Sequence, residues 1–151
     1  VPFIFLFVTS CETTKPTVNL TPLEIQSMQS RSYEHPKDVV FPSVMSVFQD
    51  LGYSINSADM VTGLITAEST AASDKAMKFW LGITKVTQTK ANAFIEEISG
   101  QTKVRINFIT TNKKSDWYGQ TDREDNQILT PEPYQNAFEK IENAVFIRSS
   151  S

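Results

Sequence analysis

The sequence predicts an α+β fold in which two main helices pack on one face of an antiparallel sheet. Three observations predict it: a hairpin pattern over residues 90–111, helical apolar spacing over residues 38–51, and a second helical stripe after Thr130. A helix with one apolar stripe must bury that stripe, and the apolar face of the hairpin is the available surface. The chain has 151 residues, 40% of them hydrophobic, which suits one domain with a packed core.

Short strands are predicted in the first half of the chain. Residues 24–33 alternate weakly between faces and are expected to form a strand. Residues 53–56 begin another strand, and residues 62–68 return antiparallel to it across a turn at 57–61. Residues 69–88 show no clear pattern and fit either a short helix or an insertion loop.

A helix is predicted over residues 38–51, ahead of the second strand. Asp38 is its expected N-cap, and Gly52 is its expected stop signal. Pro42 interrupts the pattern, so either the helix starts later than Asp38 or its first turn is irregular. The apolar residues that recur at helical spacing are Val40, Val44, Val47, Phe48 and Leu51.

The hairpin is the best-determined unit of the sequence. Residues 90–99 and 102–111 alternate between apolar and polar side chains, as half-buried strands do. Its two-residue loop is either Ser99-Gly100 or Gly100-Gln101, and the two choices give different registers. Both registers place the same apolar side chains on one face, which is the predicted core face: Ala93, Ile95, Val104, Ile106 and Phe108.

The C-terminal part is predicted to be a polar loop followed by a helix. The loop covers residues 113–127. Thr130 is a natural N-cap, and Pro131 suits the first helical position. The apolar stripe that should lie on the hairpin comprises Tyr134, Ala137, Phe138, Ile141 and Val145.

Composition and motifs argue against several classes of site. A net charge of −3 gives no indication of the positively charged surface that nucleic-acid binding requires. With one cysteine and one histidine, a zinc site of the usual nitrogen and sulfur ligands is nearly excluded, and His35 is expected to be a surface turn residue. The acidic residues Asp122, Glu124 and Asp125 lack the spacing of a calcium loop and should be solvated. No serine lies in a nucleophile motif, so we expect a chain without catalytic residues, metal or cofactor.

Aromatic residues stand in the two stretches that regular structure explains least. Trp80 falls within residues 69–88, and Trp117 and Tyr118 fall within residues 113–127. They either plug the open ends of the core or form a candidate contact patch, because aromatic residues are enriched at interaction surfaces.

The N-terminal residues carry the clearest signal of location. An apolar run over residues 1–8 ends in VTSC at residues 8–11, which resembles the lipobox of bacterial lipoprotein signal peptides. The resemblance implies that the Cys11 thiol carries a diacylglycerol, that the peptide is cut before Cys11, and that the new amino group takes a fatty acid such as palmitate. The alternative is a buried strand that ends at an ordinary free cysteine. Eight apolar residues are too few for a membrane span of ~20.

This interpretation divides the chain into three parts. Residues 1–10 are a signal peptide truncated at its start, residues 11–23 are the lipidated cysteine and its tether, and residues 24–149 are a single α+β domain.

Four segments of the domain carry a resemblance: FQDLGY at 48–53, GLITA at 63–67, KVRINF at 103–108 and YQxxFxKI at 134–141. In this order they are similar to segments of a group of uncharacterised bacterial lipoproteins, and the similarity covers most of residues 24–148. The order of elements also resembles helix-grip domains and the domains of the BamC-type outer-membrane assembly lipoprotein, at the level of fold alone.

The resemblance implies a protein of the bacterial cell envelope, anchored by lipid on Cys11. In such lipoproteins, an aspartate after the cysteine tends to retain the protein in the inner membrane. Because Glu12 stands there instead, the expected location is the outer membrane, facing the periplasm. The expected function is a non-catalytic interaction or accessory domain with an envelope protein as partner. The alternative is a small-ligand or glycan-binding module, with Trp80, Trp117 and Tyr118 around a cleft between helix and sheet.

Overall fold

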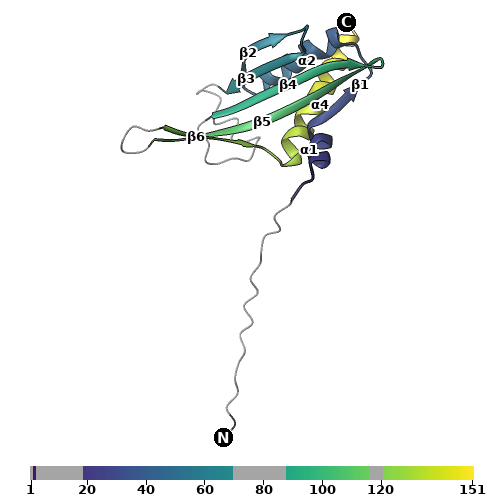
Figure 1. Cartoon of the computed structure of the whole chain (residues 1–151). Coiled ribbons are helices and arrows are strands. Elements are labelled where there is room, and N and C mark those ends of the chain that lie inside the picture. The colour runs from purple at the N-terminus through teal and green to yellow at the C-terminus, as the bar shows by residue number, and fades with distance from the viewer. Residues whose placement is uncertain (1, 3–18, 70–87, 116–120) are drawn as a thin grey trace.

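The computed structural model describes residues 2, 19–69, 88–115 and 121–151 of the chain. Within these residues it confirms the α+β class. Six antiparallel strands form one sheet in the order β1-β5-β4-β3-β2, with β6 also paired to β5. Figure 1 shows α2 and α4 packed on the same side of this sheet, as the two apolar stripes predict.

The first element corrects the strand predicted over residues 24–33. The chain forms helix α1 over Pro22–Gln29 and only then strand β1 over Ser30–Tyr33. A reciprocal cap starts the helix: the Thr21 amide donates to the Glu24 carboxylate at 2.7 Å, and the Glu24 amide donates to the Thr21 hydroxyl at 3.3 Å. With Pro22 at the first helical position, this local signal outweighs the weak alternation that follows. Helix α1 also begins two residues before the expected domain boundary.

Helix α2 spans Lys37–Asp50, so it starts earlier than Asp38 and not later. The N-cap is Pro36, and Asp38 lies in the first turn instead of capping it. Pro42 is accommodated inside the helix. The predicted stop is confirmed: Gly52 has a φ of 94°, and its amide donates to the carbonyl of Gln49 at 3.0 Å.

Strands β2, Tyr53–Asp59, and β3, Leu64–Ser69, pair antiparallel as predicted. The turn between them lies at residues 60–63, later than the predicted 57–61, because β2 continues through a bulge between Ile55 and Ser57. Gly63 ends this turn with a φ of 80°.

Strands β4, Gln88–Ile98, and β5, Gln101–Ser115, form the predicted hairpin. Its loop is Ser99-Gly100, with φ of 52° and 78°, as a mirror-image turn of type I′ requires. The register therefore sets Ile95 opposite Val104. All five side chains of the predicted core face are buried: Ala93, Ile95, Val104, Ile106 and Phe108.

The polar loop predicted at residues 113–127 is wrong over most of its length. Strand β5 continues to Ser115, and strand β6, Thr121–Gln127, pairs with it antiparallel. Figure 1 shows this second hairpin extending beyond the body of the domain. The described side chains at residues 124–127 are exposed, so the strand lacks the apolar alternation by which a sequence reveals one.

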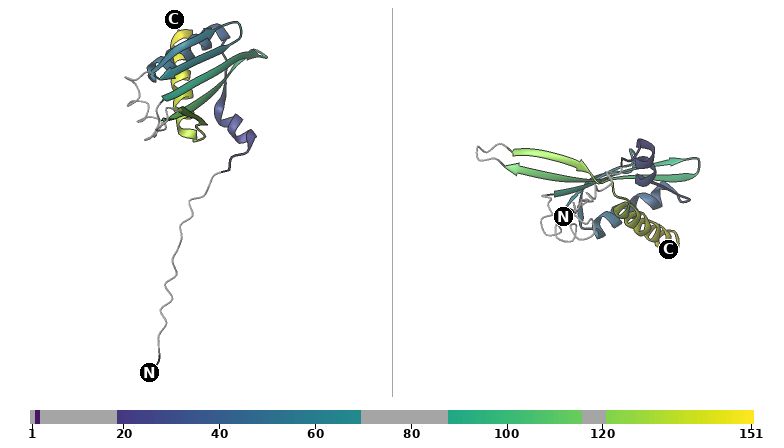
Figure 2. Two further views of the ribbon diagram at one scale, coloured as in Figure 1. Left: turned by 60° about the vertical axis from the view of Figure 1, so that its left-hand side comes forward. Right: turned by 90° about the horizontal axis from the view of Figure 1, so that it is seen from below.

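Helix α4 spans Pro131–Ser149 and follows the predicted cap position at Thr130. Its whole apolar stripe is buried against α2 and the sheet, and Figure 2 shows the two helices lying together beneath the strands. The centre of the core is a group of aromatic rings with neighbouring centroids 5.1–6.4 Å apart: Phe48, Tyr53, Phe108 and Tyr134.

Three buried tyrosines of the described residues make the domain sensitive to alkali. Burial of the Tyr33, Tyr53 and Tyr134 phenols raises the pKa of each one above the ordinary value for tyrosine. Above about pH 10 the unfolded chain loses these protons while the folded chain keeps them, so stability that is complete below that pH is lost as the pH rises. Above about pH 10, we expect the free energy of unfolding to fall by about 1.4 kcal/mol per pH unit for each phenol that stays protonated in the folded chain. Denaturant titrations at stepped pH measure it, and a constant free energy of unfolding from about pH 10 to about pH 12 would contradict it.

Candidate functional site: a groove on the outer face of the sheet

The four residues predicted as site residues, Cys11, Trp80, Trp117 and Tyr118, lie outside the described residues. Among the residues that the structure does describe, no group of three histidine, cysteine or acidic side chains could hold a metal ion. His35 is half-buried after β1, where its carbonyl accepts a hydrogen bond from the Thr102 hydroxyl at 2.6 Å.

The acidic residues predicted to lie in a loop belong to β6 instead. The Asp125 carboxylate accepts a hydrogen bond from the Thr111 hydroxyl at 2.7 Å, and Glu124 is exposed. Asp122 pairs with Lys114 through the backbone.

The strongest candidate site is a groove on the outer face of the sheet, the face opposite α2 and α4. Side chains alternate along a strand, so the neighbours of the buried Ile65, Ala93 and Ile106 point outward. On β3, β4 and β5 these neighbours line a groove of about 540 Å³. The outward-facing residues of the groove are Leu64, Thr66, Asn92, Phe94, Arg105 and Asn107.

One row across the groove combines apolar surface with a cation. Leu64 lies opposite Phe94, and Phe94 lies opposite Arg105 on the next strand. The exposed fractions of Leu64 and Phe94 are 51% and 39%, so two large apolar side chains meet water side by side. Directly opposed side chains on neighbouring strands are close enough to form one contact surface.

The next row is neutral and polar. Thr66 lies opposite Asn92, and Asn92 lies opposite Asn107. The Asn107 side-chain oxygen is buried and has no hydrogen-bond partner among the described residues. Buried polar atoms of this kind are uncommon, because each one left unsatisfied costs roughly 1–3 kcal/mol.

The cationic end of the groove lies at Arg105. Arg105 also lines a smaller groove of about 260 Å³, which Lys103 and α1 border. The ion pairs among the described residues join other side chains: Arg31 to Glu142 at 3.9 Å, and Lys90 to Glu68 at 3.7 Å.

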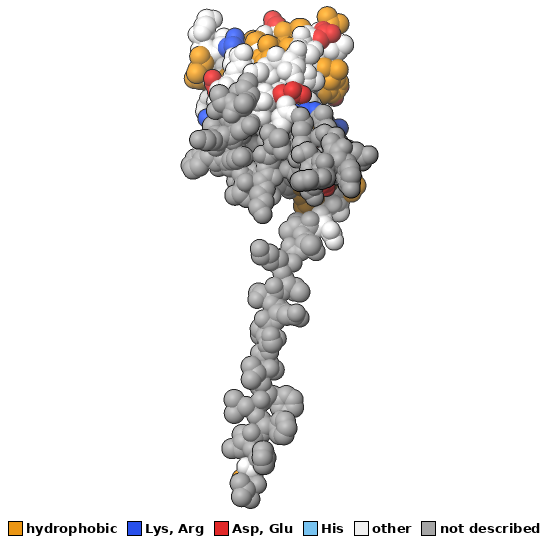
Figure 3. All heavy atoms as spheres, turned by 90° about the vertical axis from the view of Figure 1, so that its left-hand side faces the viewer, with side chains coloured by type: hydrophobic (Ala, Val, Ile, Leu, Met, Phe, Trp, Pro, Cys, Tyr) orange, Lys and Arg blue, Asp and Glu red, His pale blue; other side chains and the backbone are white. Residues whose placement is uncertain are grey.

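Among the described residues, no acidic side chain lines either groove, although Glu96 lies opposite Lys103 in the adjacent row. The positive charge of Arg105 is therefore not balanced within the groove. Elsewhere the charges are mixed: on the described surface in Figure 3, separate hydrophobic patches alternate with scattered acidic and basic side chains.

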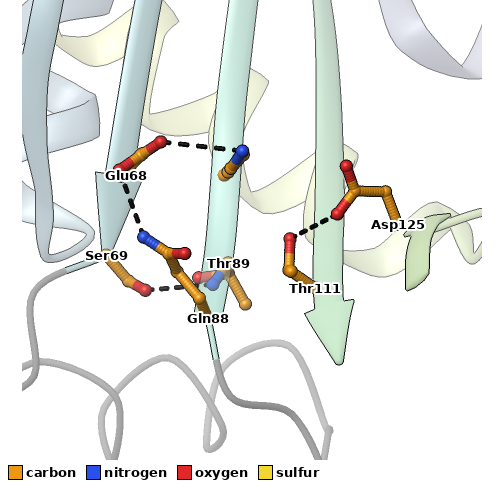
Figure 4. Close-up of polar contacts among 7 residues, drawn as sticks. Glu68, Ser69, Gln88, Thr89, Thr111 and Asp125 are labelled. Atoms are coloured by element: carbon orange, nitrogen blue, oxygen red, sulfur yellow. Dashed lines mark hydrogen bonds and ion pairs between the residues drawn. The ribbon is translucent and has the colours of Figure 1, made fainter. Parts of the chain in front are cut away.

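Polar contacts link the strands at the end of the sheet beyond the groove, as Figure 4 shows. The Glu68 carboxylate accepts a hydrogen bond from the Gln88 amide at 3.1 Å and lies 3.7 Å from the Lys90 ammonium. The Ser69 hydroxyl accepts from the Thr89 amide at 3.0 Å. These contacts join β3 to β4 where the chain leaves one strand and re-enters the sheet at the other.

Comparison with known proteins assigns this chain to no family. No protein-family model matches the chain, and no curated protein matches its sequence. Within the described residues, none of the helices combines the length and the apolar character that crossing a membrane requires. The function must therefore be argued from the chain itself.

The groove residues were not predicted as a site, although the sequence contains one indication of it. Phe94 stands at an outward position of the predicted hairpin, where a polar residue is usual. Leu64 gives no such signal, because only the pairing of β3 with β4 places it beside Phe94.

Proposed function

We propose that this chain is a lipoprotein of the bacterial cell envelope, anchored by acyl chains on Cys11 and carrying a non-catalytic interaction domain. The observation that carries the proposal is the apolar run that ends in a small-residue tripeptide before Cys11. A thioether-linked diacylglycerol supplies two acyl chains, which suffice for stable anchoring. The proposed address is the outer membrane, facing the periplasm.

The arrangement of the domain is compatible with that role. Helix α1 begins at Pro22, so ten residues lie between Cys11 and its start. Fully extended, such a tether reaches at most ~40 Å, which would leave the domain free to meet an envelope protein near the membrane. The groove is lined by apolar, amide, hydroxyl and guanidinium groups, which suit binding, and none of its lining side chains is a general base at neutral pH.

Replacing Cys11 with serine tests the anchor. Serine offers no thiol for lipid transfer, so we expect Cys11→Ser to stay unprocessed and to leave the membrane fraction. Thr13→Ser, a conservative change in the neighbouring tether, should remain lipidated and membrane-bound. Fractionation of native-host cells and mass spectrometry of the N-terminal peptide provide the readouts. A Cys11→Ser protein that stays on membranes after a salt wash, or an unmodified sulfur in the parent chain, would refute the anchor.

A small-ligand or glycan-binding module is the second candidate. The groove exceeds the ~300 Å³ typical of the smallest ligand sites, and it combines an aromatic ring with amide side chains. It lies on the outer face of the sheet, not between helix and sheet. Recurrent capture of one envelope protein by the native lipoprotein would support the interaction domain, whereas retention on isolated peptidoglycan or oligosaccharide would support the alternative.

A further inference from the structure

The outer-face groove arranges three kinds of chemistry in a fixed order across three strands. Leu64 and Phe94 supply apolar surface on β3 and β4, and Arg105 supplies a cation on β5 in the same row. The amides of Asn92 and Asn107 lie in the row beside them. Because these residues sit on paired strands of one sheet, their spacing is set by the backbone ladder.

Arg105 specifies the charge of the occupant. Its side chain is exposed, forms no ion pair among the described residues, and lines a groove without an acidic side chain. A guanidinium presents a planar fork of donors that matches the two oxygens of a carboxylate. Charge complementarity therefore favours an occupant that carries a carboxylate.

The other residues specify what accompanies the carboxylate. Leu64 and Phe94 offer a branched aliphatic chain beside a ring, which suits an apolar side chain better than the hydroxyl-rich face of a sugar. Asn92 offers amide donors and an acceptor, and Asn107, whose side-chain oxygen is buried, offers amide donors; together they can pair with peptide N–H and C=O groups. Once the carboxylate of a fatty acid pairs with Arg105, the rest of the molecule is hydrocarbon and has no polar group to pair with these amides.

We propose that this groove binds an acidic peptide segment of the envelope partner. An aspartate or glutamate of that segment pairs with Arg105, and a neighbouring apolar side chain packs on Leu64 and Phe94. The inference rests on the proposed function of an interaction domain and names the surface and the chemistry of its partner.

Peptide titration of the full chain in detergent micelles tests the proposal. The probe is a short peptide in which two aspartates flank a phenylalanine and a leucine, and its control has both aspartates replaced by asparagine. We expect the amide NMR signals of the groove strands to shift and saturate with the acidic probe. The control peptide should bind at least about tenfold more weakly, because charge-assisted hydrogen bonds are about twice as strong as neutral ones.

Two matched variants test whether Arg105 is the cation that binds the acidic probe. Arg105→Gln should weaken binding of the acidic probe about tenfold, because it removes the fork at the groove. Lys103→Gln removes the same charge from a residue that borders only the smaller groove, and it should change binding less than about twofold. Unchanged thermal unfolding of both variants establishes that neither change disturbs the fold.

Each other outcome overturns the inference. Saturating shifts elsewhere, no saturation, or equal affinity for the acidic and neutral probes would refute the acidic-peptide site. Binding of an oligogalacturonate in place of the peptide would assign the groove to acidic glycans. If Arg105→Gln still captures the same envelope protein with equal affinity, the groove is not the contact surface, while the function as an interaction domain stands.

Discussion

Gly63→Ala is expected to destabilise the domain by about 3 kcal/mol or more. Gly63 has a φ of 80°, and a Cβ added there would lie 1.9 Å from the backbone carbonyl oxygen of Ile95. The two backbones cannot easily separate, because the Ile95 amide donates to the Gly63 carbonyl at 2.9 Å. The new methyl group must therefore break the contact between the β2–β3 turn and strand β4. Denaturant unfolding of the two proteins measures the loss.

Gly100→Ala is the matched control for this effect. Gly100 has a φ of 78°, nearly that of Gly63, but apart from its own atoms and its two chain neighbours, no heavy atom of the described residues lies within 4 Å of the added Cβ. It should cost only the strain of a left-handed conformation, about 1–2 kcal/mol. If Gly63→Ala and Gly100→Ala lose the same stability, the left-handed φ alone accounts for the cost. That result would contradict the close approach of Gly63 to Ile95. Because Leu64 follows Gly63, the first variant should also weaken any binding in the outer-face groove.

Tyr134→Phe is expected to cost about 2–4 kcal/mol although it removes a single oxygen atom. The buried Tyr134 hydroxyl donates to the carbonyl of Ile128 at 2.7 Å. It also accepts from the Phe108 amide at 3.2 Å and from the side chain of Gln29 at 3.3 Å. Phenylalanine would leave three buried polar groups without this partner, each in a place from which water is largely excluded.

Tyr33→Phe provides the comparison for Tyr134→Phe. The Tyr33 hydroxyl is also buried, but its one hydrogen bond to a described residue is to the carbonyl of Phe138, at 3.2 Å. Its loss should cost about 1 kcal/mol, so denaturant unfolding should rank the two variants clearly. If both variants lose the same stability, the Tyr134 hydroxyl is not the junction that ties α1 and β5 to the start of α4.

Two elements with clear local signals, helix α4 and the β4–β5 hairpin, were predicted from the sequence with the right type. The i, i+3, i+4 spacing from Tyr134 to Val145 defines the buried face of α4 without any knowledge of its neighbours. The turn residues Ser99 and Gly100 define the hairpin, and alternation defines which of its faces is buried. The α1 segment carries two competing signals, the cap formed by Thr21 and Glu24 and a weak alternation over residues 24–33, and the cap decides its structure.

Two features had no local signal. Strand β6 is polar and exposed at its described side chains, so it is held by backbone pairing with β5 rather than by burial of one face. The outer-face groove needs Leu64 from β3 beside Phe94 from β4 and Arg105 from β5, and no pattern within one segment states which strands are neighbours.

By itself, the sequence determined the α+β class, the two helical stripes and the hairpin with its core face; the lipid anchor at Cys11 stays a prediction. These properties follow from residues that are near one another in the chain, where periodicity, caps and turn chemistry act. Only the tertiary structure decided the order of the strands and therefore the surface opposite the helices. That surface depends on pairing between distant segments, which is selected by the packing of the whole core.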